Sequence, residues 1–100
     1  MDIKELTQKM NQFVSTQGWY DKDSPRPQTL IKLAISLTLE AAEVLEHFQW
    51  SDEMDEPEQL GEELADVALY LLQIASIAEI DLEHAILQKL ERNYKRSWED

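Results

Sequence analysis

The 100-residue chain has no cysteine and only two glycines. The absence of cysteine excludes a disulfide framework and a thiolate metal site, and it fits a reducing compartment. The N-terminus lacks the basic-then-apolar layout of a signal peptide. The most apolar stretch, 64–80, is interrupted by Asp66, Gln73 and Glu79. We therefore expect a cytoplasmic protein that does not insert into a membrane.

Positive charge is scarce. Nine Lys and Arg residues are outnumbered by 21 Asp and Glu residues, so the formal net charge is −12 at pH 7. No Lys or Arg lies between Leu33 and Gln88, a stretch that holds 14 carboxylates. This balance excludes general affinity for nucleic-acid backbones, which requires Lys and Arg that neutralise phosphates. Any carboxylate of the stretch that becomes buried needs a bound cation.

Strand-like alternation is also absent, whereas apolar residues recur at helical spacing along the chain. We expect helices over about 2–17, 29–49, 55–80 and from 81 onward. Thr29, Asp55 and Asp81 are expected as N-caps, and Gly18 is expected to end the first helix. The second helix is apolar on several faces, so we expect it to be the most buried helix or one that a partner buries. In the last helix, the side chains expected to face inward are Leu82, Ile86, Leu90 and Tyr94. The sequence predicts an all-α, four-helix bundle-like subunit in one domain, 1–100, and its small size favours an oligomer.

Two pairs of carboxylates stand out on the second and third helices. Glu40 and Glu43, like Glu63 and Asp66, are three residues apart, so each pair projects from one helix face. Glu40 shares its face with apolar residues, where a carboxylate is costly unless a positive charge meets it. Solvated helix faces explain either pair alone, but the two pairs together favour a metal site. Carboxylate ligands without Cys favour Mg²⁺ or Mn²⁺ over Zn²⁺.

A stripe of polar and basic residues follows on the last helix. It comprises Lys89, Arg92, Asn93 and Arg96. Such a stripe is usually a solvated face that complements the helix dipole. Beside a carboxylate metal site, however, it favours a phosphate-bearing small molecule held between metal and Lys or Arg.

Four segments carry a resemblance to a known family: LEAAEVLEHFQW at 39–50, EELADV at 62–67, IDL at 80–82 and KLERN at 89–93. Over about 17–96 the chain resembles the MazG-like all-α nucleoside triphosphate pyrophosphohydrolases, and most of all their short deoxycytidine triphosphate pyrophosphatase branch. Two departures bear on base specificity and leave the metal site intact. SPRPQTL at 24–30 replaces the branch's His-x-Pro-Lys-Asn-Leu segment, and Ser97-Trp98 replaces a closing Tyr-Pro.

The resemblance implies a homodimer or dimer of dimers that hydrolyses a (deoxy)nucleoside triphosphate to monophosphate and pyrophosphate, with dCTP or a related dNTP preferred, for nucleotide-pool cleansing. The catalytic residues and Mg²⁺ ligands that it implies are Glu40, Glu43, Glu63 and Asp66, one of which also orients the attacking water. The implied phosphate-binding residues are Lys89, Asn93 and Arg96. The implied base-binding residues are Phe48 and Trp50.

Three further residues have competing interpretations. His47 is more typical of a surface or capping residue than of a ligand, so we leave it outside the catalytic set. Trp19, like Phe48 and Trp50, is equally suited to a base pocket and to a core or subunit contact. Glu62 is more typical of a solvated residue than of one supporting the metal site. Two alternative functions remain open: a non-catalytic acidic helical dimerisation module, and a pyrophosphohydrolase of the same fold that acts on phosphoribosylated nucleotides.

Overall fold

A computed structural model describes residues 1–49 and 56–97. Within these ranges the chain forms four α-helices and no strand. They are α1 (Ile3–Thr16), α2 (Leu30–Glu46), α3 (Pro57–Ile77) and α4 (Leu82–Lys95). The predicted all-α class and the four helices are confirmed. Asp55, Trp50 and Trp98 fall outside the described residues. The N-cap position of α3 is Glu56, not the predicted Asp55, and its side chain makes no capping hydrogen bond.

The helix starts follow from short local signals in the sequence. Side-chain oxygens of Thr29 and Asp81, both predicted caps, accept hydrogen bonds from backbone N–H groups three residues on, at 3.3 Å and 3.0 Å. Pro57 occupies the first turn of α3, where its missing N–H costs nothing. Gly18 follows the end of α1 with φ of +77°, a conformation that favours glycine. These residues fix where the helices begin or end.

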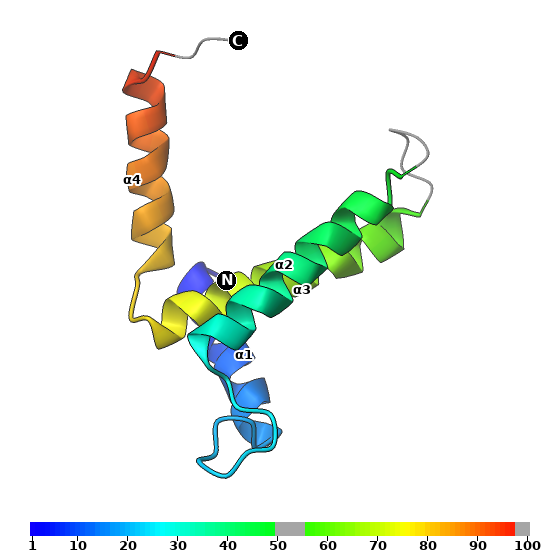
Figure 1. Ribbon diagram of the computed structural model, residues 1–100. Coiled ribbons are helices and arrows are strands. Elements are labelled where there is room, and N and C mark those ends of the chain that lie inside the picture. The colour runs from blue at the N-terminus through cyan, green and yellow to red at the C-terminus, as the bar shows by residue number, and fades with distance from the viewer. Residues whose placement is uncertain (50–55, 98–100) are drawn as a thin grey trace.

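The core lies where α1 crosses α3. Met10, Val14 and Leu72 are buried there, and Trp19 and Leu82 pack against them. α2 lies alongside α3 and runs antiparallel to it (Figure 1). This antiparallel pair places the middle of α2 next to the first half of α3, the two segments that carry the predicted carboxylate pairs.

α4 extends away from the other helices (Figure 1). Leu82 in its first turn packs on the core, but Ile86, Leu90 and Tyr94 are 43%, 49% and 90% exposed. The prediction that these three face inward is wrong for the single chain, because no other helix of the described chain runs beside α4. In α2 only Leu33 is buried, so the expectation that it is the most buried helix also fails, and burial by a partner stays a prediction.

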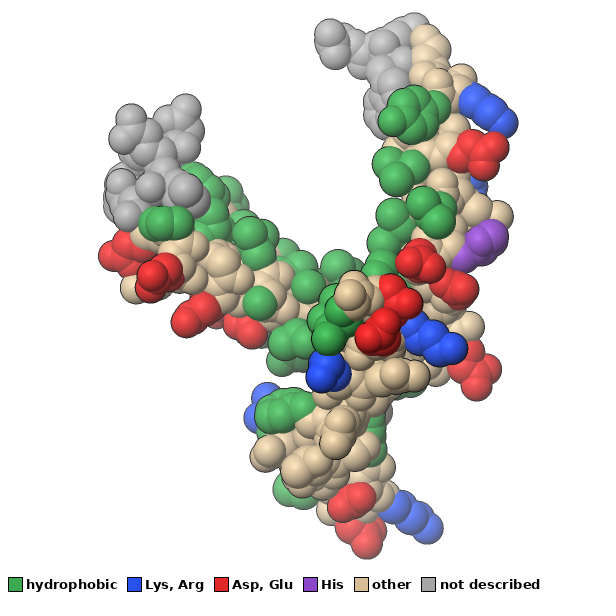
Figure 2. Space-filling model, turned by 180° about the vertical axis from the view of Figure 1, so that it is seen from behind, with side chains coloured by type: hydrophobic (Ala, Val, Ile, Leu, Met, Phe, Trp, Pro, Cys, Tyr) green, Lys and Arg blue, Asp and Glu red, His purple; other side chains and the backbone are tan. Residues whose placement is uncertain are grey.

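None of the helices in the described ranges is long and apolar enough to cross a membrane. The apolar residues they expose are instead distributed along amphipathic faces. Figure 2 shows these side chains along the sides of α4 and of the α2–α3 pair that face each other across an open space.

Candidate functional site

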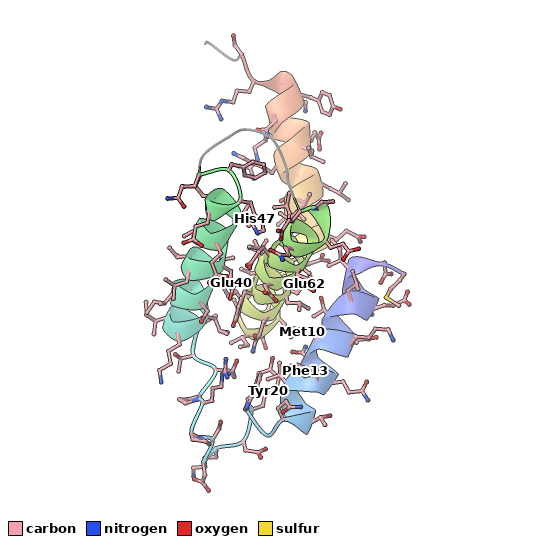
Figure 3. The ribbon with its side chains drawn as sticks, turned by 90° about the vertical axis from the view of Figure 1, so that its right-hand side faces the viewer. Met10, Phe13, Tyr20, Glu40, His47 and Glu62 are labelled. Carbon is pink, nitrogen blue, oxygen red and sulfur yellow. The ribbon has the colours of Figure 1, made fainter. Side chains whose placement is uncertain are left out.

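Three carboxylates meet between α2 and α3. Glu40 and Glu43 come from α2 and Glu63 from α3, and one carboxylate oxygen of each lies within 4.8 Å of the others. Figure 3 shows Glu40 between the two helices, at the middle of their contact. All three side chains are half-buried. The antiparallel packing of α2 on α3 therefore turns two separate sequence pairs into one cluster.

Two oxygens of this cluster have no hydrogen-bond partner although they are buried: Oε2 of Glu40 and Oε2 of Glu63. Buried polar atoms without a partner are rare and costly. Local cations do not relieve the cost, since α3 contains no Lys or Arg and α2 contains only Lys32 in its first turn. The cluster has the oxygen ligands that Mg²⁺ and Mn²⁺ prefer, so its residues fit a hard divalent cation.

The electrostatics of the cluster agree with its crowding. Burial, and then the neighbouring carboxyls of Glu43 and Glu63, raise the pKa of Glu40 to about 7. A hydrogen bond with Glu43, and then burial, raise the pKa of Glu63. Carboxylates that crowd together and repel one another retain protons to higher pH than usual. A divalent cation would replace the protons of Glu40 and Glu63 and let both groups ionise.

Asp66, the fourth predicted ligand, lies one turn beyond Glu63 on α3. It is not part of the close group of three. Its negative charge nevertheless raises the pKa of Glu40 and of Glu63. Glu62, next to Glu63, is exposed, as its interpretation as a solvated residue requires.

The predicted phosphate-binding residues lie on a different part of the fold. Lys89 and Asn93 belong to α4 and Arg96 caps its C-terminal end. Because α4 diverges from α2 and α3 (Figure 1), the single chain does not bring them beside the carboxylate cluster. Phe48 is half-buried just past α2, where His47 is the C-cap residue. Trp50 falls outside the described residues.

A pocket of about 810 Å³, which the sequence did not reveal, lies between α1, the loop 17–29, α2 and α3. This size is typical of small-molecule sites. Most of its wall is apolar or aromatic, with Phe13 and Trp19 among the lining residues, and Phe48 is not among them. Asp66 borders the pocket, so the pocket adjoins the predicted ligand set.

The pocket has a sequence signal that could have been used. Asp66, Tyr70 and Gln73 line it, and their spacing of four and three residues places them on one face of α3. Trp19 reaches the pocket from the loop, where its ring makes an edge-to-face contact with Phe13 at 5.7 Å. It packs on the core and lines the pocket at once, so both interpretations of Trp19 keep their support.

The fold and the site together define an all-α protein with a carboxylate cluster suited to a divalent cation, beside a pocket of the size that small-molecule sites usually have. The model of the MazG-like family matches residues 35–100. The chain belongs to the MazG-like family, which confirms the resemblance predicted from its motifs.

Comparison with individual proteins agrees with the family. The chain is 27% identical to dCTP pyrophosphatase 1 of Rattus norvegicus and 28% identical to that of Homo sapiens, in both cases over 94% of this chain. It spans 58% of the length of these relatives. The crystal structure of a pyrophosphatase from Archaeoglobus fulgidus DSM 4304 is similar at a TM-score of 0.73 and 34% identity, and covers 92% of this chain and 88% of that one.

Proposed function

We propose that the protein hydrolyses nucleoside triphosphates to nucleoside monophosphate and pyrophosphate with Mg²⁺, or with Mn²⁺ in its place, and that it prefers dCTP or a related deoxynucleotide. The observation that carries the proposal is the cluster of Glu40, Glu43 and Glu63, with its unpartnered buried oxygens, beside a pocket bordered by Asp66. Membership of the MazG-like family and similarity to proteins named dCTP pyrophosphatase 1 support it.

In this proposal Glu40, Glu43, Glu63 and Asp66 hold the cation. A divalent cation here supplies charge neutralisation at phosphate oxygens and lowers the pKa of a bound water. A carboxylate oxygen that is not used as a ligand orients the attacking water and accepts its proton. The water oxygen forms a bond to the α-phosphorus, the bond from that phosphorus to the bridging oxygen breaks, and pyrophosphate leaves with the bridging oxygen.

We further propose that the protein works as a homodimer or a dimer of dimers. The proposed phosphate-binding residues Lys89, Asn93 and Arg96 lie on a helix that diverges from the carboxylates of its own chain (Figure 1). A second copy whose α4 packs against α2 and α3 would bring them into reach. It would also cover apolar side chains such as Leu39 and Leu87, which are 60% and 59% exposed. Because Leu82 packs α4 onto the core formed by α1 and α3, we propose that residues 1–100 form one domain. We also propose that the protein acts in the cytoplasm.

The assembly is tested by sedimentation of the wild type, Leu87→Glu and the neighbouring exposed control Gln88→Glu. We expect the wild type and Gln88→Glu to sediment as oligomers and Leu87→Glu to dissociate, because a charge in an apolar interface must be desolvated. A wild type that sediments at its chain mass of 11.7 kDa at micromolar concentration contradicts the proposed assembly.

The activity is tested by pyrophosphate release from the standard and deoxy triphosphates in Mg²⁺. We expect turnover by the wild type, and its loss in excess EDTA and in Asp66→Ala, with helicity by circular dichroism unchanged. Turnover that survives EDTA contradicts the metal site. Absence of cleavage of any triphosphate, together with no Mg²⁺-dependent rise in melting temperature, favours the non-catalytic dimerisation module.

A further inference from the structure

Gln73 is a polar side chain in the most buried part of α3. Only 4% of its surface is exposed, and burying a carboxamide is costly unless it is hydrogen-bonded. Its Nε2 donates to Oε1 of Gln28 at 2.8 Å, and Nε2 of Gln28 donates to the backbone carbonyl of Arg26 at 2.7 Å. Gln28 and Gln73 both line the 810 Å³ pocket. The pocket wall, otherwise mainly apolar, therefore contains a connected pair of carboxamides.

The two hydrogen bonds fix the orientation of both carboxamides. Rotating the amide of Gln28 by half a turn would place its oxygen against the carbonyl oxygen of Arg26 and its NH₂ group against the NH₂ group of Gln73. Both contacts would be repulsive. Each carboxamide has two N–H donors and an oxygen with two acceptor sites. Gln73 also makes a side-chain hydrogen bond with Tyr20, so the capacity left at the pocket is the oxygen of Gln73 together with one N–H and one acceptor site of Gln28. The pair thus offers donors and acceptors in a fixed order.

The pair lies at a suitable distance from the carboxylates. Asp66 and Gln73 share one face of α3, and seven residues of helix span about 10 Å along the axis. This span is comparable with the distance from the α-phosphate of a nucleotide to the pairing edge of its base. Trp19 lines the same pocket and supplies an aromatic ring on which a base can stack. The Arg26 guanidinium lies 4.5 Å from the centre of that ring.

We infer that Gln73 and Gln28 recognise the pairing edge of the substrate's base and select cytosine over uracil. The inference rests on the proposed function, to which it adds the residues that set base preference. Cytosine and uracil are nearly identical in shape but present opposite orders of donor and acceptor at positions 3 and 4. A carboxamide pair of fixed orientation satisfies one order and leaves groups unpaired against the other, so it can discriminate between two bases of the same shape.

The test compares kcat/KM for dCTP and dUTP in the full chain. The variants are Gln73→Glu, which replaces a donor by an acceptor at constant shape, and Gln28→Met, which removes the hydrogen bonds at a less buried position. Gln12→Met, an exposed glutamine on α1 outside the pocket, is the matched control. We expect the wild type and Gln12→Met to prefer dCTP at least about tenfold, and both pocket variants to lose most of that preference.

Three outcomes overturn the inference: a wild type that does not distinguish dCTP from dUTP, an unchanged ratio in both variants, or an equal loss on both substrates, which a packing role alone would produce. If the wild type cleaves no triphosphate, the proposed function is wrong and the base-recognition inference needs a separate test. That test is the binding of dCMP and dUMP without metal, measured by ligand-observed NMR. A preference for dCMP that Gln28→Met abolishes supports base recognition, and equal binding overturns it.

Discussion

Glu40 of α2 and Glu63 of α3 each bury one carboxylate oxygen that has no hydrogen-bond partner. With Glu43 they place three acidic side chains within 4.8 Å in the α2–α3 contact. The packing of these helices thus forces like charges together, which costs stability unless a proton or a cation intervenes.

The first prediction concerns the stability of the metal-free protein against pH. Burial and neighbouring carboxyls raise the pKa of Glu40 from its ordinary value of 4.5 to about 7 in the folded state. Between these values the folded state binds more protons at this site than the unfolded state, so the stabilisation is complete below pH 4.5 and is lost as pH rises through 7. We expect the free energy of unfolding in EDTA, from urea titrations, to fall over this interval.

General repulsion in a chain of net charge −12 also lowers stability as pH rises, so the slope needs a control. Glu40→Gln removes the titrating group without changing its shape, and Glu58→Gln removes the same charge from an exposed position in the first turn of α3. We expect only Glu40→Gln to flatten the curve. Equal slopes in the two variants would assign the effect to net charge and not to the cluster.

The second prediction separates stability from function in the same variant. At pH 8 without metal, Glu40→Gln should be more stable than the wild type because it removes a half-buried charge from a repulsive cluster. In Mg²⁺ the order of stability should reverse. A cation that binds only the folded state raises the melting temperature, and the wild type, which binds Mg²⁺ more tightly than the variant, should gain more. Losing a direct ligand should weaken Mg²⁺ binding by more than the roughly 10- to 100-fold cost of losing an outer-shell partner. Melting curves with and without Mg²⁺ measure both effects, and a variant that keeps the full Mg²⁺ shift would remove Glu40 from the ligand set.

The features that could be predicted from the sequence are those decided by neighbours along the chain. Helix spacing, the caps at Thr29 and Asp81, and Pro57 at the start of α3 all act within one turn, and the structure has them where expected. The approach of Glu40 and Glu43 to Glu63 could also be predicted from the sequence. When two consecutive helices pack antiparallel, residues at similar distances from their connection lie opposite each other, and both helices carry carboxylates at such positions.

The features that escaped prediction depend on how distant segments pack. The periodicity of α4 marks an apolar face but does not say whether this chain or another covers it, so the prediction that Ile86, Leu90 and Tyr94 face inward is wrong for the single chain. The pocket needs α1, the loop 17–29, α2 and α3 at once. Gln73 was visible as a polar break in an apolar run, but its bond to Gln28 joins residues 45 positions apart and has no local signature.

The third prediction concerns Gly61, within the first turns of α3. Glycine costs about 1 kcal/mol relative to alanine in a helix interior, and a Cβ built on Gly61 meets no atom within 4 Å. Gly61→Ala should therefore raise the free energy of unfolding by up to about 1 kcal/mol. Gly18→Ala is the opposite case, because φ is +77° and the new Cβ would lie 3.2 Å from Oδ2 of Asp21. Urea titrations of the two variants should shift in opposite directions, and a destabilised Gly61→Ala would show that another surface packs against this position.

The fourth prediction concerns Glu79, which directly follows Ala78, the C-cap residue of α3, and has a φ of +57°. The N–H of Ile80 donates to the carbonyl of Ala75 at 2.8 Å and the N–H of Glu79 donates to that of Ser76 at 3.2 Å, the pattern of a helix end that usually holds glycine. A residue other than glycine in this conformation costs roughly 1–2 kcal/mol. Replacing Glu79 by glycine removes this cost, but the greater flexibility of glycine in the unfolded state offsets part of the stabilisation. Glu79→Gly should therefore stabilise the protein by about 0.5–1 kcal/mol.

A negative charge at a helix C-terminus is itself unfavourable, so the gain must be divided between charge and backbone. Glu79→Ala removes the charge and keeps the strain, whereas Glu79→Asn removes the charge and tolerates the left-handed conformation. Backbone strain predicts the order of stability Gly above Asn above Ala in urea titrations at 0.15 M salt. If Ala stabilises the protein as much as Gly does, the helix dipole accounts for the effect and the φ of Glu79 is not strained.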